Sequence, residues 1–304
     1  MGVGSVVVLA NPTAGHGKAG RNIGRIDGVL RNVGVAHEIR VSGSAAELEA
    51  LARSSAEDGA DVVAALGGDG TVNLVANGLL GTDATLAVLP GGTADDFAAS
   101  IGVKTLDAAA RAIAEGTVVP IDVVRVEAAG GVRRHYVNIA GCGFDSEVNE
   151  AANGMRVKLG ATGTYVAALL KTLPRFKPAR FRIQLDDEMI EGPHMLVIVG
   201  NSISYGGGMK VTPDASIVDG KLDVCLLAAM GTGSFLRAFP RVFRGTHVTH
   251  PKVRMARATR VRVEADRRVM VYADGERIGP APASFEVLPG SLPTIVGPNA
   301  KAVR

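Results

Sequence analysis

The sequence predicts an α/β protein of two domains: a parallel α/β domain first, then a mostly antiparallel β domain. Three observations predict this. The first third alternates short β-branched runs with longer alanine-rich segments of helical period, as in a parallel sheet covered on both faces. After about Gly116 most segments have the character of strands. The length of 304 residues and a hydrophobic content of 47% are enough for two cores.

In the first domain, short apolar runs predict strands, and apolar residues every three or four positions predict helices. Ser44 precedes one helix and Glu47 follows it three residues later, which is the pattern of a capping box. The expected strands are residues 5–9, 36–41, 61–66 and 85–89. The expected helices are residues 21–32, 45–58, 72–79, 95–100 and 106–115.

The second domain reads as mostly antiparallel, beginning with two strands separated by an Ala-Ala-Gly-Gly turn. Its expected strands are residues 118–127, 134–139, 180–185, 195–200, 222–227, 260–265, 269–272 and 284–287. Its expected helices are residues 162–173 and 233–244. We place the first domain at residues 1–117 and the second at 118–288.

Composition restricts the class of partner. The net charge of +3 is mild and does not indicate a nucleic-acid binder. Cys142 and Cys225 lie in apolar surroundings, which indicates two buried thiols and a reducing cytoplasm rather than a disulfide framework. The N-terminal apolar run lacks a basic leader, and no uncharged apolar stretch approaches the roughly 20 residues of a spanning helix. Any membrane contact is therefore expected to be peripheral.

Three glycine-rich loops, residues 11–18, 67–71 and 90–93, each follow a predicted strand of the first domain. In a parallel sheet all three lie at the carboxyl ends of strands, where ligands bind. Glycine lets the backbone approach a phosphate closely, and the helix that follows supplies unpaired N–H groups. Further donors are Asn11, Lys18, Thr71 and Thr93. The loops predict a phosphate site, although neither a P-loop nor a dinucleotide fingerprint is present.

Asp69 is the acidic residue of the second loop, and two interpretations are open. A carboxylate repels a polyphosphate unless magnesium stands between them. Alternatively, Asp69 caps the following helix at Thr71 or Val72, which is a common role for aspartate. The phosphate site around it favours metal or metal-bound water.

The segment GGDGTVN, with NPTAG upstream and PGGTADDFA downstream, resembles the diacylglycerol-kinase catalytic domain. That family also includes sphingosine and ceramide kinases and bacterial lipid kinases. NIAGCGFD at 138–145, the segment 200–224 and ADGE at 273–276 resemble its later blocks in order, so the resemblance covers essentially the whole chain. GGDGT alone is shared with NAD kinases and, loosely, phosphofructokinases.

The resemblance implies ATP and magnesium as cofactors and an active site in the cleft between two domains, with the tail 289–304 returning to the first. It implies Glu276 as general base, Asp69 in a catalytic role and Asp96 orienting the base or the magnesium. The residues expected to hold ATP are Asn11, Pro12, Thr13, Ala14, Gly15, Lys18, Ser42, Gly67, Gly68, Asp69, Gly70, Thr71, Gly92 and Thr93.

The magnesium site implied by the resemblance is a loop in which the Asp219 carboxylate and the carbonyl groups near Ser216 and Lys221 coordinate the ion. From the residues alone, Asp219-Gly220 is equally a turn before a strand. For a metal bound there mainly through backbone carbonyls, a structural and a catalytic role are both open. Glu276 likewise has a simpler interpretation, as an exposed residue after an Asp-Gly hairpin turn.

Two positions depart from the family pattern. The residue after Asn73 is usually acidic in the family and is Leu74 here. In the block usually written Asn-Asp-Phe, the first residue is Asp95, which replaces an amide with a charge. Both departures concern turnover more than fold.

We expect an ATP- and magnesium-dependent lipid kinase, most simply one that converts diacylglycerol to phosphatidic acid at the inner face of the cytoplasmic membrane. Residues 155–182 and 235–244 mix cations with apolar residues and suit anionic lipid, although each alone reads better as a solvated face. His247 and His250 indicate a loop or core role rather than zinc. The alternatives are a soluble NAD-kinase-like enzyme and a non-catalytic lipid- or nucleotide-binding relative. We also consider a homodimer formed through edge strands.

Overall fold

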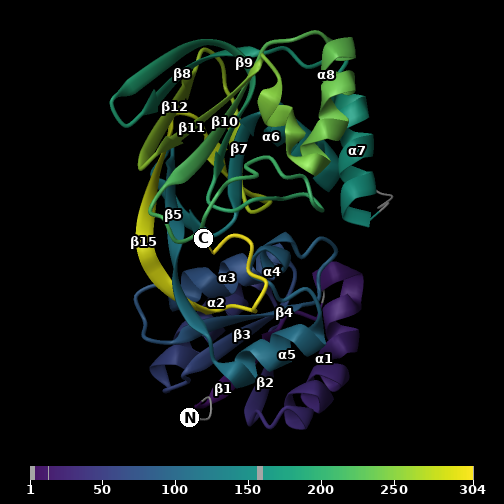
Figure 1. Ribbon diagram of the computed structural model, residues 1–304, viewed down its shortest axis with the longest axis vertical. Coiled ribbons are helices and arrows are strands. Elements are labelled where there is room, and N and C mark those ends of the chain that lie inside the picture. Colours follow the sequence, from purple (N-terminus) through teal and green to yellow (C-terminus); the bar gives the residue numbers. More distant parts are fainter. Residues whose placement is uncertain (1–3, 13, 156–159, 304) are drawn as a thin grey trace. The chain divides into compact units, whose positions relative to one another are not determined.

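The computed structural model describes residues 4–12, 14–155 and 160–303. The chain divides into two compact units (Figure 1). Unit 1 contains residues up to Val123 together with Pro289–Arg304, and unit 2 contains Val124–Leu288. The first boundary falls six residues beyond the expected position, because β5 (Val118–Ala128) is one continuous strand that no turn interrupts.

Unit 1 is built on a parallel sheet with the strand order β4, β3, β1, β2. Its strands are β1 (Val6–Ala10), β2 (His37–Val41), β3 (Val62–Gly67) and β4 (Thr85–Pro90). Near its end, β15 (Ala283–Ile295) adds a parallel pairing at Thr294 beside Leu86 of β4. Every residue of β1 and β3 is buried, as the continuous apolar runs predicted for central strands.

Five helices accompany this sheet in the described part of unit 1 (Figure 1). They are α1 (Ala14–Asn32), α2 (Ala45–Glu57), α3 (Asp69–Leu79), α4 (Asp96–Ser100) and α5 (Leu106–Glu115). Before α2, the Ser44 hydroxyl accepts the Glu47 N–H at 3.2 Å, and the Glu47 carboxylate accepts the Gly43 N–H at 2.6 Å. The capping interaction is thus present, with its return bond shifted by one residue.

Two helices begin earlier than the sequence predicted. We expected starts at Arg21 and Val72, whereas α1 begins at Ala14 and α3 at Asp69. Glycine has a low helix propensity, so the glycine-rich starts read as loops. In the fold these glycines occupy the first turns of helices that follow their strands almost directly.

Unit 2 is a β-sandwich in which β9 (Glu188–Gly200) is shared by both sheets. The first half of β9 pairs with β8, and its second half lies between β7 and β10. One sheet has the order β14, β13, β7, β9, β10, β11, and the other runs β9, β8, β12, β15, β5, β6. The remaining strands are β6 (Val132–Tyr136), β7 (Ile139–Gly143), β8 (Ala179–Leu185), β10 (Leu222–Ala228), β11 (Val253–Ala258), β12 (Arg260–Ala265), β13 (Met270–Ala273) and β14 (Glu276–Pro280).

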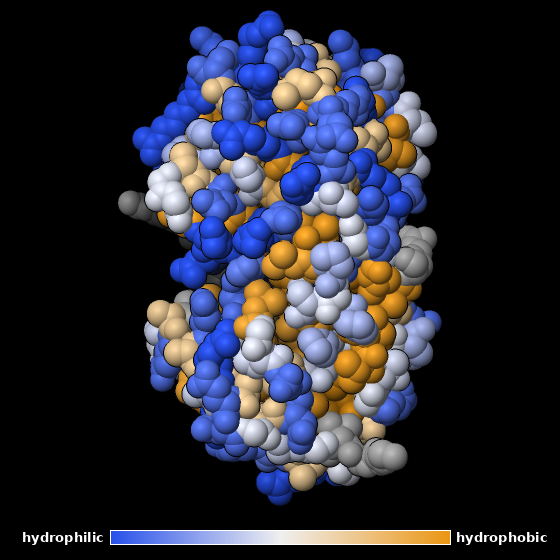
Figure 2. Space-filling view, turned by 90° about the vertical axis from the view of Figure 1, so that its left-hand side faces the viewer, coloured by the Kyte–Doolittle hydropathy of each residue, from blue (hydrophilic) through white to orange (hydrophobic). Residues whose placement is uncertain are grey.

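The two sheets enclose one apolar core with contributions such as Tyr136, Phe181 and Phe285. The outer face of β8 and β12 alternates polar residues with this core, and hydrophilic residues predominate on that side of unit 2 (Figure 2). The predicted fold class, parallel α/β followed by antiparallel β, is therefore confirmed.

A helical layer covers the other face of the β7–β9–β10 sheet. It consists of α6 (Phe144–Asn153), α7 (Gly160–Thr172), α8 (Thr232–Ala238) and two 3₁₀ helices, η1 (Phe239–Arg244) and η2 (Thr246–Thr249). The helix expected at 233–244 divides at Phe239 because Pro240 has no N–H for an α-helical bond. None of the helices in the described ranges is both long and apolar enough to cross a membrane.

Candidate active site

The three glycine-rich segments of unit 1 meet at the carboxyl end of its sheet. The Asn11 N–H approaches the Leu66 carbonyl at 3.4 Å, and the Gly91 N–H donates to the Gly67 carbonyl at 2.8 Å. A Cβ atom on Gly92 would lie only 2.4 Å from the Cα atom of Gly68. The backbones of the second and third loops are therefore in direct contact, which only glycine permits.

Helix N-termini follow these loops, so unpaired amides gather at the same edge. Gly70 and Thr71 lie in the first turn of α3, and Ala14 and Gly15 in the first turn of α1. Such amides favour an anion. Ser42 follows β2, where its N–H donates to the Ala10 carbonyl at 3.0 Å and its buried hydroxyl reaches the same oxygen at 3.4 Å.

For the remaining residues expected to bind the nucleotide, the structure gives a position in the fold but few contacts. Lys18 lies in α1, and Thr93 directly follows Gly92 in the loop before α4. Pro12 ends the loop after β1 and lies against Gly20 of α1. Thr13 falls outside the described residues.

The Asp69 carboxylate caps α4, whereas the sequence suggested that it caps its own helix, α3. It accepts the N–H of Phe97 at 2.9 Å and the N–H of Asp96 at 3.3 Å, at the start of α4. The first turn of α3 is therefore tied to the start of α4 across 27 residues of sequence. Asp69 therefore has a structural role in joining α3 to α4.

The local structure around Asp95 explains why aspartate can replace the asparagine that is usual at this position in the family. Its backbone is left-handed, at φ 54°, and its side chain accepts the Gly92 N–H at 2.8 Å. Asparagine adopts the same conformation and its carbonyl oxygen accepts the same bond. The exchange of asparagine for aspartate therefore preserves the loop. The adjacent Asp96 is buried, at 4% exposure.

Glu276 follows a two-residue hairpin turn between β13 and β14 and is exposed. Asp274 and Gly275 have φ values of 47° and 82°, the conformation that Asp-Gly hairpins favour. The Asp274 carboxylate accepts the N–H groups of Val137 at 3.0 Å and Ile139 at 2.9 Å, among others. The turn that presents Glu276 is therefore anchored to the start of β7.

The loop expected to hold magnesium already contacts a cation. Asp219 accepts the Lys221 N–H at 3.1 Å, and its other oxygen pairs with the Arg257 guanidinium. Arg257 also faces Asp223 at 3.4 Å, whose pKa is raised chiefly by burial. No cluster of three or more His, Cys, Asp or Glu side chains in the described part of the chain is arranged to hold a metal. The oxygen donors here, including the carbonyl groups of Ser216 and Lys221, suit magnesium in kind, but Arg257 competes for the same carboxylate.

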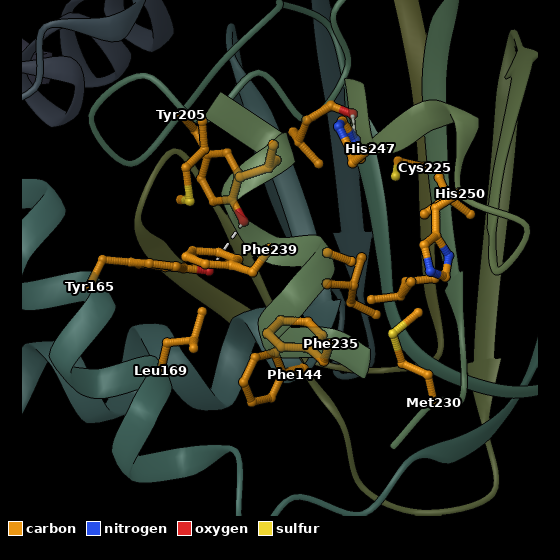
Figure 3. Close-up of a pocket in the computed structure, with 17 residues that line it drawn as sticks. Phe144, Tyr165, Leu169, Tyr205, Cys225, Met230, Phe235, Phe239, His247 and His250 are labelled. Atoms are coloured by element: carbon orange, nitrogen blue, oxygen red, sulfur yellow. Dashed lines mark hydrogen bonds between the residues drawn. The ribbon is translucent and has the colours of Figure 1, made fainter. Parts of the chain in front are cut away.

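The helical layer of unit 2 covers an apolar pocket that the sequence did not reveal (Figure 3). Its walls come from α7, α8, η1 and the sheet beneath them, and its free volume is about 80 Å³. Phe235 packs edge-on against Phe144 at 5.2 Å and stacks on Phe239 at 5.8 Å between ring centroids. The pocket as it stands has room for the end of an acyl chain. His247 and His250 also line it.

A buried carboxylate adjoins this pocket. The Tyr165 hydroxyl, on the pocket wall, donates to Asp145 at 2.7 Å, and the Tyr205 hydroxyl donates to the same oxygen. Asp145 is 2% exposed, and burial raises its pKa and those of both tyrosines. The Tyr165 and Tyr205 hydroxyls lie on the wall of this mostly apolar pocket and face each other at 3.3 Å (Figure 3). Asp145 lies in the NIAGCGFD block, but nothing in that block indicated its partners.

Both units of this chain match families of known proteins. Residues 5–126 match the diacylglycerol kinase catalytic domain, and residues 138–296 match the YegS C-terminal NAD kinase beta sandwich-like domain. A diacylglycerol kinase of Mycobacterium tuberculosis is 36% identical over 293 residues, covering 95% of this chain and 94% of that protein. The chain belongs to the diacylglycerol kinase family.

Other members of the family are similar over the same length. A diacylglycerol kinase of Bacillus subtilis is 29% identical, with 91% of each chain covered. A Stenotrophomonas maltophilia protein described as a probable lipid kinase is 30% identical, with 94% of each covered. A crystal structure of a Bacillus anthracis protein assigned to the diacylglycerol kinases has a TM-score of 0.77 at 27% identity and covers 97% of both chains. The resemblance inferred from the motifs is confirmed.

Proposed function

We propose that this protein transfers the γ-phosphoryl group of ATP to a hydroxyl of a membrane lipid, diacylglycerol in the first instance, and so forms phosphatidic acid. Membership of the diacylglycerol kinase family supports a lipid kinase. The observation that carries the acceptor class is the apolar pocket in unit 2, because a pocket lined mainly by aromatic and aliphatic side chains suits an acyl chain and not a soluble sugar or nucleotide.

Unit 1 would bind the nucleotide. The amides of Gly70 and Thr71 at the start of α3 would meet the phosphates, and the absence of a Cβ atom on Gly68 and Gly92 lets the two loop backbones lie in contact beside them. Phosphoryl transfer needs positioning and charge neutralisation above all. The fixed backbone of these loops supplies the positioning without reorganisation.

Unit 2 would supply the acceptor and the base. The acceptor hydroxyl oxygen attacks the γ-phosphorus, its proton passes to the Glu276 carboxylate, and the bond to the β-phosphate oxygen breaks to release ADP. A positioned base of this kind contributes roughly a hundred- to ten-thousand-fold. Magnesium, bound with ATP, neutralises charge on the transferring phosphates. We assign Asp69 first to the cap on α4, where it holds the two phosphate loops together.

The protein would act at the inner face of the cytoplasmic membrane, where ATP is present and the buried thiols Cys142 and Cys225 stay reduced. Burial raises the pKa of each thiol to about 12, which suits inert core residues. A homodimer through edge strands would use β11, which pairs only with β10 among the described residues.

A soluble NAD-kinase-like activity is the second candidate, because the matched second domain takes its name from the NAD kinase sandwich. One experiment separates the two. Purified protein is incubated with magnesium and γ-labelled ATP against a panel of lipid alcohols in mixed micelles, with NAD and lipid-free controls.

Label in diacylglycerol supports the proposal, label in another lipid alcohol corrects the acceptor, and label in NAD moves the protein to the second candidate. An Ala238→Trp variant, which fills the pocket from α8, should raise the KM for lipid and leave the KM for ATP unchanged. Binding of ATP without any transfer would indicate a non-catalytic relative and refute the proposal.

A further inference from the structure

A carboxylate of α6 is buried in the helical layer of unit 2. Asp145 is 2% exposed, and it takes part in no ion pair among residues 4–12, 14–155 and 160–303. Its oxygens instead accept hydrogen bonds from the Asn149 amide at 3.2 Å, from the Tyr165 hydroxyl at 2.7 Å and from the Tyr205 hydroxyl. Burial of a carboxylate costs free energy unless it is hydrogen-bonded, so these donors offset the cost of placing Asp145 inside the fold.

The two tyrosines lie between this carboxylate and the apolar pocket. Tyr165 comes from α7 and Tyr205 from the loop after β9, and both line the pocket, whereas Asp145 does not. Both hydroxyl groups donate to the same Asp145 oxygen, and the two hydroxyl oxygens lie 3.3 Å apart (Figure 3). Because their hydrogens are already used, the lone pairs that remain can only accept. The pocket wall therefore presents a pair of hydrogen-bond acceptors, which the carboxylate behind them polarises.

His247 adds a further acceptor to the same pocket. Its Nε2 lies 3.1 Å from the Val211 carbonyl oxygen, which can only accept, so this nitrogen carries the ring hydrogen. Its Nδ1 is then an acceptor, and it is buried without a hydrogen-bond partner. His247 is 7% exposed and lines the pocket. Few buried polar atoms in folded proteins lack a partner, so this nitrogen indicates a site for a donor that the chain itself does not supply.

The size of the pocket restricts what can bind there. Its free volume of about 80 Å³ has room for about three groups the size of a water molecule, so it takes only the end of an aliphatic chain. An ester or ether oxygen at that end has no hydrogen to give to the acceptors. An ammonium group needs acceptors for three N–H bonds and direct contact with a carboxylate, but Asp145 lies behind the tyrosines. A hydroxyl, with one hydrogen to donate, fits this wall.

We propose that the pocket binds the hydroxyl-bearing end of an aliphatic chain, with Tyr165 and Tyr205, held in place by Asp145, accepting the hydrogen of that hydroxyl. The acceptor lipid carries this hydroxyl in addition to the one that is phosphorylated, so the two tyrosines determine which lipid is preferred. This role rests on the proposed lipid kinase function, but binding in the pocket requires neither ATP nor phosphoryl transfer.

One lipid molecule can reach both the tyrosines and the proposed base, because both belong to unit 2. A Cβ atom on Gly141 would lie 2.5 Å from an oxygen of Asp145, which places the carboxylate against β7. Gly141 pairs with Tyr272 of β13, and the next residue, Ala273, pairs with Glu276 of β14. Neighbouring strands lie about 4.8 Å apart, so about 10 Å of sheet separates Gly141 from Glu276. An ordinary lipid chain is longer than this.

Binding is measured by calorimetry with three probes, without nucleotide. They are 1-decanol, its isomer methyl nonyl ether, which has no hydrogen to donate, and decylammonium chloride. Tyrosine fluorescence locates the binding, because the chain has no tryptophan and two of its four tyrosines are Tyr165 and Tyr205. Wild type should bind the alcohol about fivefold more tightly than the ether, and more tightly than decylammonium. Tighter binding of either the ether or decylammonium would overturn the proposal.

Tyr165→Phe and Tyr205→Phe each remove one acceptor, so each should lower the ratio of alcohol to ether affinity severalfold and leave the ether affinity unchanged. Tyr136→Phe is the matched control, because it removes a fully buried hydroxyl that donates to the Val199 carbonyl at 3.0 Å in the sandwich core. It should leave the ratio unchanged. An equal change of the ratio in all three variants would overturn the proposal, and the wild-type comparison decides it even if a variant does not fold.

The kinase assay tests the effect on lipid preference. A diacylglycerol with a hydroxyl at the end of one acyl chain should have a KM about fivefold lower than its unsubstituted counterpart, with kcat unchanged. Equal KM values would overturn the role in lipid preference. Selective binding of 1-decanol by a protein that phosphorylates no lipid alcohol would count against the proposed function alone.

Discussion

Replacing Gly92 with alanine tests the contact that brings the phosphate loops together. The new Cβ would lie 2.4 Å from the Cα atom of Gly68 and 2.6 Å from the Asp95 carboxylate oxygen. Ordinary carbon contacts are about 3.5–4.0 Å, so the two backbones must separate by more than 1 Å or so. Neither obstacle is the free end of a flexible side chain, because Asp95 is held by the Gly92 N–H.

The expected cost combines two terms. Overpacking of this kind costs about 1–3 kcal/mol, and loss of the hydrogen bond from Gly92 to the Asp95 carboxylate adds about 1.5 kcal/mol or more. We expect unfolding of unit 1 to become easier by about 3 kcal/mol, which lowers its Tm by about 10 °C. ATP affinity should fall with it, because the amides of the two loops no longer converge.

Gly28→Ala is the matched control, since a Cβ atom there meets nothing within 4 Å in the middle of α1. It should leave ATP affinity unchanged and stabilise the protein by up to about 1 kcal/mol. The measurements are thermal unfolding and ATP titration calorimetry. A Gly92→Ala protein as stable as wild type would show that the loops do not pack as described.

Three further predictions concern side chains around the site. Asp69→Ala removes the cap on α4 and should cost about 1–2 kcal/mol in denaturant unfolding, whereas Asp69→Asn keeps an acceptor and should cost less than half of that; equal losses would contradict the capping role. Arg257→Gln removes the competing cation and should raise magnesium affinity, measured by calorimetry without nucleotide, by about tenfold or more; no gain, or a gain that survives Asp219→Asn, would show that the ion does not bind at this loop. His247 has a pKa lowered from 6.5 by burial, so the folded state favours the neutral ring. Its contribution is fully present above pH 6.5 and is lost as the pH falls, so His247→Gln, which keeps a donor for the Val211 carbonyl, should reduce the loss of Tm on acidification; an unchanged pH profile would refute this.

The architecture of unit 1 could be predicted because its signals are local. Continuous apolar runs gave its strands to within a residue or two at most ends, and Ser44 with Glu47 marked the start of α2. The starts of α1 and α3 could not be predicted in the same way. Glycine at their first turns lowers helix propensity, and only tertiary contact with the neighbouring loop stabilises those turns.

The parts of the site that the sequence did not reveal depend on long-range contacts. Asp69 meets Phe97 across 28 residues, and Arg257 meets Asp219 across 38. The apolar pocket collects side chains from Phe144 to Val253. The sequence singled out His247, His250 and the stretch 235–244 among them, but nothing in it indicated that these residues line one pocket. Spacing along the chain does not contain this information, because it arises only when the sandwich and its helices pack.

Lipid kinase activity with Glu276 as its base is tested most directly by the initial rate of label transfer from γ-labelled ATP to diacylglycerol, compared between wild type and Glu276→Gln. Glu276 is exposed on a hairpin, so the substitution should leave folding and ATP binding intact. We predict transfer by wild type and a loss of roughly a hundredfold or more in the variant. Transfer at the same rate by both proteins would remove Glu276 as the base, and no transfer by a wild-type protein that binds ATP would contradict the lipid kinase itself.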